Sequence, residues 1–348
     1  MIQFQCDYNE GAHPMILQRL AETNMEQTVG YGEDPYCEQA RELIRKACQN
    51  DNIDVHFLVG GTQTNTTVIA HTLRPYQGVI SAVSGHINVH ETGAIEATGH
   101  KVLAIASADG KLTAAQVEEA VMAHRNEDGP EHMVQPGMVY LSFPTEVGTV
   151  YTLSELKAIS TVCRKYELPL FIDGARLGYG ICSPESDITL PDLAQLADVF
   201  YIGGTKVGAL FGEAVVITGE TLKRDFRYSI KRHGGMLAKG RLLGLQFATL
   251  FTDNLYMQIA QHAIDEAMRI KAALQEAGIK FLIDSPTNQQ FPIFSHAQLE
   301  VLSKKYRFSF WQQMDAEHAV VRICTSWGTK SENVDSLIED IKQIKKIV

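Results

Sequence analysis

Short apolar strands alternate with helical patterns along most of the chain, and this alternation constrains the fold more than any other feature. Helices are predicted between the strands, one of them near Val89–Thr98, and Thr113 with Gln116 and Thr152 with Glu155 have the spacing of capping boxes. Short apolar strands separated by helices form mostly parallel sheets that are covered on both faces. We therefore predict an α/β fold whose large domain holds a mostly parallel seven-stranded sheet covered by helices. The predicted strands are Val55–Val59, Gly78–Val83, Lys101–Ala106, Met138–Phe143, Leu170–Ile172, Val199–Ile202 and Ala214–Thr218.

The pattern changes after about Gly235. Long helices are predicted at Met236–Leu250 and Met257–Ala277, and a last helix begins at Ser331. These segments indicate a smaller C-terminal α+β domain. We predict an N-terminal arm over residues 1–15, a large cofactor-binding domain over 16–250 and a small domain over 251–348. The strands predicted in the small domain lie near Lys280–Ile283, Phe291–Phe294, Phe308–Phe310 and Val320–Thr325.

Composition excludes several classes of protein. The 348 residues carry a net charge of −10 without a basic block, which argues against binding to nucleic acid or to an anionic membrane. No apolar run is long enough to span a membrane, and the N-terminus does not resemble a signal peptide. The six cysteines are scattered without a C-x-x-C pair, which predicts reduced thiols in a cytoplasmic protein and no metal site.

Lys206 follows a predicted strand and two glycines in the segment FYIGGTKVGALFG. Burial in such a turn lowers the pKa of a lysine, and a neutral amine forms an imine with an aldehyde. Our hypothesis is that Lys206 holds pyridoxal 5'-phosphate as a Schiff base. The alternative is a solvated surface lysine, which is the usual state of this residue type.

Three further features meet the needs of this cofactor. Asp173 follows a buried strand, where a carboxylate can hold a proton on the ring nitrogen, although it could also be a turn residue. The turn Gly60-Gly61-Thr62-Gln63 opens a helix and offers backbone N–H groups to the phosphate, although it could be a plain strand-to-helix turn. His86 lies at the next strand end and could stack on the ring, although a lone histidine is more often structural. Their shared location at strand ends supports the cofactor hypothesis.

These motifs resemble the aminotransferase-like fold type I family of pyridoxal-phosphate enzymes, and within it the threonine aldolase/β-eliminating lyase group. The resemblance extends over nearly the whole chain, and the Asp-Gly-Ala-Arg-Leu string is its most group-specific mark. The matching segments are Tyr31-Gly32-Glu33-Asp34-Pro35, Gly61-Thr62-Gln63-Thr64-Asn65, Gly85-His86-Ile87, Asp173-Gly174-Ala175-Arg176-Leu177, Thr205-Lys206, Gly234-Gly235-Met236 and Val321-Arg322-Ile323.

The resemblance implies a role for each matching residue. Lys206 would bind the cofactor aldehyde, Asp173 its ring nitrogen, and His86 its ring face and the substrate hydroxyl. Arg176, placed beside the cofactor, and Arg322 would hold the substrate carboxylate through bidentate contacts. The remaining implied contacts are Gly61, Thr62, Gln63 and Thr205 for the phosphate, His132 for the substrate hydroxyl, Tyr31 for closure of the pocket from a neighbouring subunit, and Cys6 for the substrate carboxylate.

The chain departs from the group at three positions. The arm has Cys6-Asp7-Tyr8 where threonine aldolases have Ser-Asp-Thr, and cysteine is a weaker hydrogen-bonding residue than serine. His90 takes the place of an aromatic residue four positions after the stacking histidine. Leu237 stands where the group has arginine after Gly-Gly-Met. These departures bear on the identity of the substrate.

The resemblance implies retro-aldol cleavage of a β-hydroxy-α-amino acid, most simply L-threonine or L-allo-threonine, to glycine and acetaldehyde. His86 or His132 would take the proton of the hydroxyl group. The alternatives are another β-eliminating lyase, an aminotransferase, or a scaffold that binds the cofactor without catalysis. The expected partners are an amino-acid substrate and a second or further copies of the chain, in a homodimer or homotetramer with active sites at the subunit interface.

Overall fold

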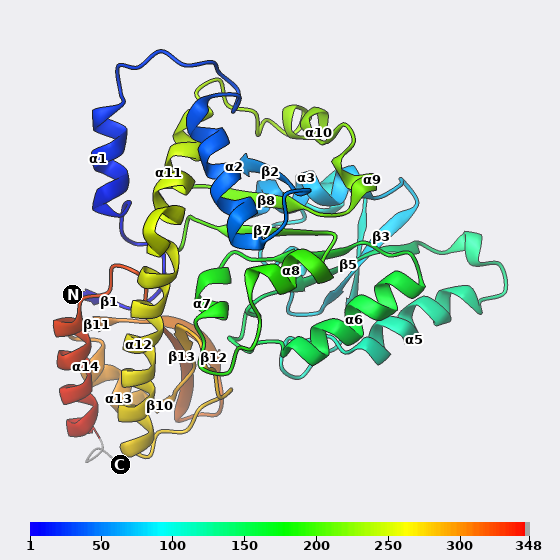
Figure 1. The fold of residues 1–348 in the computed structure, drawn as a ribbon. Coiled ribbons are helices and arrows are strands. Elements are labelled where there is room, and N and C mark those ends of the chain that lie inside the picture. The colour runs from blue at the N-terminus through cyan, green and yellow to red at the C-terminus, as the bar shows by residue number, and fades with distance from the viewer. Residues whose placement is uncertain (345–348) are drawn as a thin grey trace.

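A seven-stranded sheet forms the centre of the computed structural model, which describes residues 1–344 (Figure 1). Its strands are β2 (Asp54–Leu58), β3 (Gln77–Ala82), β4 (Lys101–Ile105), β5 (Gln135–Ser142), β6 (Leu170–Asp173), β7 (Val199–Gly203) and β8 (Glu213–Ile217). Their order in the sheet is β2-β8-β7-β6-β5-β3-β4. Only β8 is antiparallel to its neighbours, so the carboxyl ends of the other six strands share one edge. The predicted fold class is confirmed.

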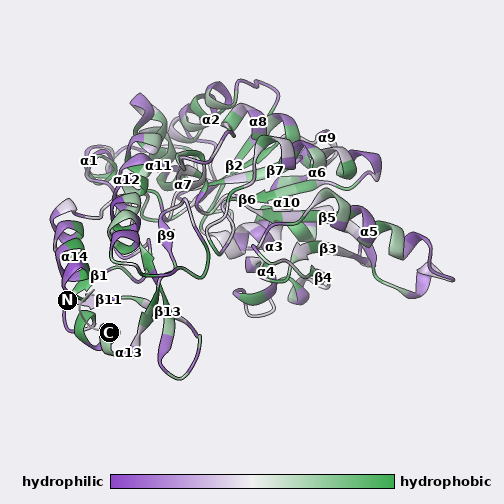
Figure 2. Ribbon diagram, turned by 90° about the horizontal axis from the view of Figure 1, so that it is seen from below, coloured by the Kyte–Doolittle hydropathy of each residue, from purple (hydrophilic) through white to green (hydrophobic). Residues whose placement is uncertain are grey.

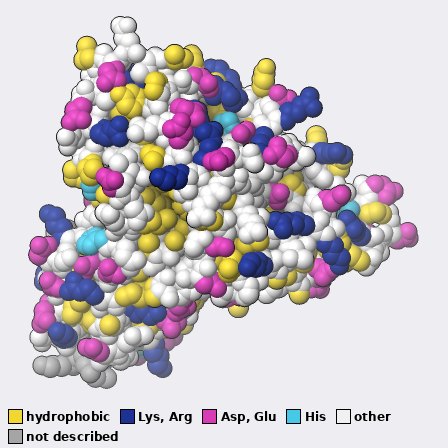
Figure 3. Space-filling view, in the orientation of Figure 1, with side chains coloured by type: hydrophobic (Ala, Val, Ile, Leu, Met, Phe, Trp, Pro, Cys, Tyr) yellow, Lys and Arg dark blue, Asp and Glu magenta, His cyan; other side chains and the backbone are white. Residues whose placement is uncertain are grey.

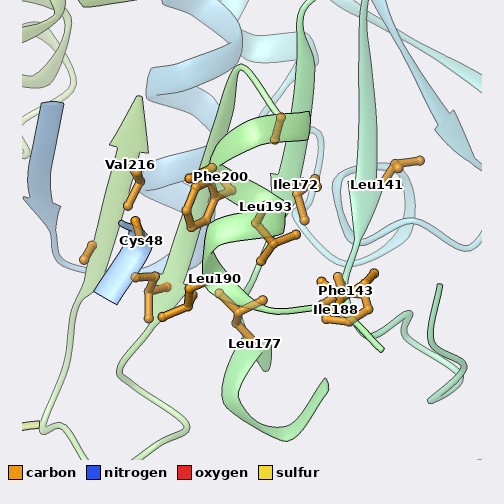
Figure 4. Packing of buried hydrophobic residues seen from close by; sticks show 14 of the residues in the cluster. Cys48, Leu141, Phe143, Ile172, Leu177, Ile188, Leu190, Leu193, Phe200 and Val216 are labelled. Carbon is orange, nitrogen blue, oxygen red and sulfur yellow. The ribbon is translucent and has the colours of Figure 1, made fainter. Parts of the chain in front are cut away.

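Helices cover both faces of this sheet, because its strands direct apolar side chains alternately to the two sides (Figure 2). Phe200 and Ile202 pack on one side with Leu193, as Figure 4 shows for Phe200 and Leu193, whereas Val199 and Tyr201 belong to the core on the other side. The helices of the first side are α2 (Pro35–Cys48), α5 (Ala114–Arg125), α6 (Leu153–Lys165), α7 (Leu177–Ile181), α8 (Leu190–Leu196) and α11 (Arg241–Phe251). Those of the second side are α3 (Gly61–Thr72), α4 (His86–Val89), α9 (Glu220–Lys223) and α10 (Phe226–Arg232).

Local sequence signals set the ends of several helices. Thr113 with Gln116 at α5 and Thr152 with Glu155 at α6 form complete capping boxes, as predicted. Asp34 caps α2 by accepting the N–H of Cys37, and a proline follows it at the first helical position. Helix α1 (Pro14–Glu22) also begins with proline.

A smaller sheet and two long helices form the C-terminal part. Strands β9 (Gln289–Gln290), β10 (Ile293–Ser295) and β12 (Ser309–Gln313) all pair with β13 (His318–Cys324). Helices α12 (Leu255–Glu276), α13 (His296–Leu302) and α14 (Ser331–Ile344) accompany them. The N-terminal strand β1 (Ile2–Gln3) pairs in parallel with β11 (Tyr306–Arg307), and Phe4 belongs to the C-terminal core. The arm is therefore bound to the C-terminal part.

Four predicted segments were wrong in detail. The helix expected at Val89–Thr98 is divided into α4 and a 3₁₀ turn (Glu96–Thr98), because Thr92 and Gly93 between them have positive φ. The strand expected at Lys280–Ile283 is a single bridge between Phe281 and Pro292. Pro292 has no N–H to donate, and it also separates β9 from β10 within the strand expected at Phe291–Phe294.

The long helix expected from Met236 begins instead at Arg241. Gly240 lies against the backbone of Gly32, where a Cβ would be 2.6 Å from a backbone nitrogen. Asp253 and Asn254, in left-handed conformations, separate α11 from α12. The predicted domain division at residue 250 lies beside this break, and the domain boundaries stay predictions.

The surface carries charges of both signs, which are interspersed on the face shown in Figure 3. Within residues 1–344, no helix combines the length and the apolar character that a membrane crossing needs.

We predict that Gly244→Ala destabilises the fold. A Cβ at Gly244 in α11 would lie 2.4 Å from Cα and Sγ of Cys37 in α2, and overpacking of this kind costs about 1–3 kcal/mol. The midpoint of urea unfolding should therefore fall. Gly11→Ala is the control, since its Cβ would meet no atom within 4 Å. Equal midpoints for the two variants would contradict the tight contact between α2 and α11.

Candidate active site

The carboxylate of Asp173 lies at the carboxyl end of β6 and is only 5% exposed. One oxygen accepts hydrogen bonds from the Tyr140 hydroxyl at 2.5 Å and from Asn65 Nδ2 at 3.1 Å. The other accepts from the Tyr201 hydroxyl and from the backbone N–H of Ala175 at 3.0 Å. Burial opposes ionisation of Asp173, but the nearby charge of His86 and these donors lower its pKa. A buried, ionised carboxylate results.

Lys206 lies in the turn between β7 and β8, close to Asp173. Only glycine fits two positions of this turn, because a Cβ at Gly203 would lie 2.4 Å from the carbonyl oxygen of Ala175 and one at Gly204 would lie 2.8 Å from that of Gly212. The carbonyl of Lys206 accepts a hydrogen bond from the Tyr179 hydroxyl at 2.5 Å. Burial, together with the charge of Arg176, lowers the pKa of the Lys206 amine. The amine is therefore easier to deprotonate than that of a surface lysine.

A cavity of about 370 Å³ brings these two residues together with other strand ends. Its wall includes the strand ends, the turns that follow them and one residue of the arm. The lining residues are Tyr8, Val59, Gly60, Gly61, Thr62, His86, Ser142, Pro144, Glu146, Asp173, Ala175, Arg176, Tyr201, Thr205, Lys206, Phe211 and Glu213.

The amino end of α3 opens onto this cavity through Gly60, Gly61 and Thr62. No side chain caps this helix, although α5 and α6 have complete capping boxes. Its first N–H groups are thus available to an anion, as the phosphate of pyridoxal phosphate requires. With Asp173 and Lys206 in the same cavity, the residues present fit this cofactor. The side chain of Gln63 stabilises the turn, because it accepts the Val59 N–H at 3.1 Å and donates to the His233 carbonyl at 3.2 Å.

His86 is held by a chain of polar groups beside Asp173. Its Nδ1 lies 2.7 Å from Oε1 of the buried Glu91, and Nδ2 of Asn65 donates to the same oxygen at 2.7 Å as well as to Asp173. Burial lowers the pKa of His86, but the bond to Glu91 and the charge of Asp173 outweigh burial and raise it. The His90 ring lies next to it, with 5.6 Å between centroids.

Two arginines lie toward the arm. Arg176 forms a bidentate ion pair with buried Asp7, from Nε at 2.6 Å and from Nη2 at 3.0 Å. Burial opposes ionisation of Asp7, but Arg176 lowers its pKa to about 2. Arg322 donates to Gln289 Oε1 at 3.2 Å and to the Gln5 carbonyl at 3.1 Å, and its Nε has no partner among the described residues.

Five of the expected residues do not line the cavity: Gln63 and Arg322, described above, and His132, Tyr31 and Cys6. His132 is exposed in the 3₁₀ turn before β5, and since β5 is parallel to its neighbours, that turn lies at the opposite edge of the sheet from Asp173. Tyr31 is 47% exposed and lines another hollow with Lys231 and Met236. Cys6 donates to Asn9 at 3.0 Å, and Tyr8 is the arm residue that lines the cavity.

Several site residues were missed from the sequence. Tyr140 and Tyr201 were counted among the apolar strand residues, yet their hydroxyls bind Asp173. Glu213 could have been recognised as a site residue from the sequence, because it begins an apolar strand and a carboxylate rarely begins a buried strand without a partner. The other residues missed are Asp7, Asn65 and Glu91, with the contacts given above, and Glu146, which accepts the His86 backbone N–H at 2.8 Å.

Comparisons with known proteins show which family this chain is similar to. The family model described as β-eliminating lyase matches residues 3–296. A low specificity L-threonine aldolase of Pseudomonas aeruginosa is 31% identical, with 98% of this chain and 97% of that protein covered. A solved structure of Leishmania major threonine aldolase superposes with a TM-score of 0.96 at 43% identity, covering 99% of this chain and 100% of that one.

A histidinol-phosphate aminotransferase of Clostridium acetobutylicum, at 11% identity and a TM-score of 0.76, has the same fold; 100% of both chains are covered. The likeness to this aminotransferase therefore concerns the fold alone. The match over most of the chain and the two threonine aldolases identify the family: this chain belongs to the β-eliminating lyases, a family of pyridoxal-phosphate-dependent enzymes.

Proposed function

We propose that this protein cleaves a β-hydroxy-α-amino acid, L-threonine or L-allo-threonine, to glycine and acetaldehyde. The observation that carries the proposal is the convergence of Lys206 and Asp173 on one cavity, between an uncapped helix end and Arg176. The names of the similar threonine aldolases support the choice of substrate.

The cofactor end of the cavity has three groups with distinct tasks. Pyridoxal phosphate, when bound, supplies an aldehyde that condenses with amines and a ring that accepts the electrons of the broken bond. Lys206 presents a buried amine of lowered pKa to that aldehyde. Asp173, kept ionised by its donors, would hold a proton on the ring nitrogen. The N–H groups of Gly61 and Thr62 would bind the phosphate, and Thr205 lines the same cavity.

The substrate end binds and orients the amino acid. Arg176 and Arg322 would hold its carboxylate and so fix the orientation of the bonds at Cα. Asp7 positions Arg176 by occupying Nε and Nη2, so that Nη1 is left for the substrate. His86 takes the proton of the hydroxyl group, directly or through water, while Glu91 holds Nδ1 and leaves Nε2 as the acceptor.

We propose a homodimer or homotetramer, since Tyr31 lies exposed on the surface, where a second subunit's cavity could receive it. His132 is also exposed and would act only on another subunit's site. Six free cysteines support a cytoplasmic location.

Incubation with L-threonine tests the proposed function. We expect release of acetaldehyde, followed by NADH consumption with an aldehyde-reducing dehydrogenase, and an equal amount of glycine. Lys206→Ala is the control and should release none, because it lacks the amine. Formation of a 2-oxo acid and ammonia without acetaldehyde would contradict the aldolase assignment and favour β-elimination.

Asp173→Asn should lower kcat by at least about 100-fold, equivalent to about 2.7 kcal/mol in the barrier, because a neutral amide does not stabilise a protonated ring nitrogen. The matched control is Asp198→Asn. Its carboxylate lies at the opposite edge of the sheet, where it accepts the N–H of Leu170 at 2.8 Å. Thermal unfolding checks that both variants fold. A kcat within tenfold of the wild-type value would refute the assigned role of Asp173.

Glu91→Gln should shift the acid limb of the pH profile of kcat/KM to lower pH. Glu91 raises the pKa of His86, and a base works only above its pKa. Removing the carboxylate charge lowers that pKa, so His86 becomes a free base at lower pH. Glu96→Gln, in the nearby 3₁₀ turn, is the control and should leave the limb in place. An unmoved limb in Glu91→Gln would show that His86 does not set it.

A further inference from the structure

Glu213 is a buried carboxyl group at the phosphate end of the cavity, and no step of the proposed mechanism uses it. It begins β8, where it pairs with Gly203 of β7 on one side and with Leu58 of β2 on the other. These two strands lead directly into the Lys206 turn and into the Gly60–Thr62 turn. Glu213 thus lies between the two turns, is 3% exposed, and lines the cavity with both of them.

The hydrogen bonds of Glu213 involve the same turn that faces the phosphate. Its Oε1 accepts from the Thr205 hydroxyl at 2.9 Å, and its Oε2 accepts from Gly204 N–H at 3.2 Å. The Thr205 oxygen in turn accepts from Gly212 N–H at 3.0 Å. Thr205 has a single hydroxyl proton, and that proton is directed at Glu213. Thr205 can therefore donate to a phosphate only if it gives up its hydrogen bond to Glu213.

Few positive charges near Glu213 are available to offset the charge of a second anion. The groups that face it are the Lys206 amine, the Asp173 carboxylate and the phenols of Tyr201 and Tyr256. Within the described part of the chain, the other cationic residues that line the cavity are His86 and Arg176, and these are bound to Glu91 and Asp7. Burial raises the pKa of Glu213 to about 8, although Lys206 acts in the opposite direction.

A phosphate dianion at the amino end of α3 would share this region with Glu213. Two anions in a buried site repel each other strongly, because the surrounding dielectric is low. A neutral carboxyl group has no such cost and offers an O–H donor. It also frees the Thr205 hydroxyl to turn toward the phosphate.

We propose that Glu213 serves the phosphate end of the site as a protonated carboxyl group, so that, at a pH where this side chain is ionised in the free protein, binding of a phosphorylated ligand is accompanied by its uptake of one proton from solvent. The inference rests on the proposed cofactor-dependent function. The only change in Glu213 is conversion of the carboxylate and a proton into the carboxylic acid.

The proposal fixes the sign of a pH dependence. Below pH 7 the free protein already carries the proton on Glu213, so binding requires no uptake. Above about pH 8 the free carboxyl is ionised, and phosphate affinity then falls by up to about tenfold for each further pH unit. Glu213→Gln has a neutral side chain at every pH, so its phosphate affinity should not fall in this way.

The test measures affinity at pH 7 and pH 9 for pyridoxal phosphate, for pyridoxal without the phosphate, and for inorganic phosphate. Wild-type protein is compared with Glu213→Gln and with Glu266→Gln, a buried carboxyl on α12 that binds Ser331 and Arg269 away from the cavity. For both phosphate-bearing ligands, the ratio of wild-type Kd to Glu213→Gln Kd should rise about tenfold from pH 7 to pH 9. For pyridoxal the ratio should stay constant, and Glu266→Gln should follow the wild type.

Calorimetry in two buffers of different ionisation enthalpy counts the protons directly. Wild-type protein should take up about one proton with inorganic phosphate at pH 9, and Glu213→Gln none. The wild-type count stands by itself if the variant does not fold, and a count of zero overturns the inference.

Two other outcomes separate this inference from the function. The role of Glu213 is overturned if the Kd values of wild type and Glu213→Gln for pyridoxal phosphate depend equally on pH. It is also overturned if the Kd ratio for pyridoxal rises as it does for pyridoxal phosphate. Either result leaves the proposed function standing. Failure of the wild-type protein to bind pyridoxal phosphate at either pH overturns the proposed function itself, and the inference with it.

Discussion

The ionised carboxylate of Asp173 is stabilised by hydrogen-bond donors from several elements around it. A buried charge without partners is costly, and here the donors come from β5, β7 and α3, together with the turn that follows β6 itself. Tyr140 and Tyr201 reach Asp173 because their strands flank β6 in the sheet and direct these residues to the same face. A shift of one residue in either strand would turn its phenol to the other face of the sheet. The register of the core therefore fixes the position of the charge on which the chemistry depends.

Much of the fold followed from local patterns in the sequence. The seven strands of the large sheet were predicted because each is a short apolar run that ends in a turn, and two capping boxes marked helix starts. Lys206, Asp173 and the Gly60–Thr62 turn were found because the carboxyl ends of parallel strands meet at one edge. The errors lay where backbone conformation overrode the pattern, as at Thr92 and at Pro292.

The parts of the site that sequence reasoning missed depend on long-range contacts. Asp7 and Arg176 are far apart in the sequence, and nothing in the arm shows that Asp7 will be buried against an arginine. Asn65 looks like an ordinary polar helix residue until its amide is seen between Asp173 and Glu91. The position of His132 was also not visible in the sequence, since only the direction of β5 shows that its turn lies at the opposite edge of the sheet from Asp173.

The N-terminal arm binds to the C-terminal part of the chain, so its contacts form late in translation. Ile2 pairs with Tyr306, and Arg322 donates to the carbonyl of Gln5. A ribosome releases residue 2 long before residues 306 and 322, so the arm waits without its strand partner while the chain between them is translated. The cofactor end, built from residues 54–217, has all its strands much earlier. The cofactor end of the cavity is thus completed earlier in translation than the contacts of the arm, where we propose that the substrate binds.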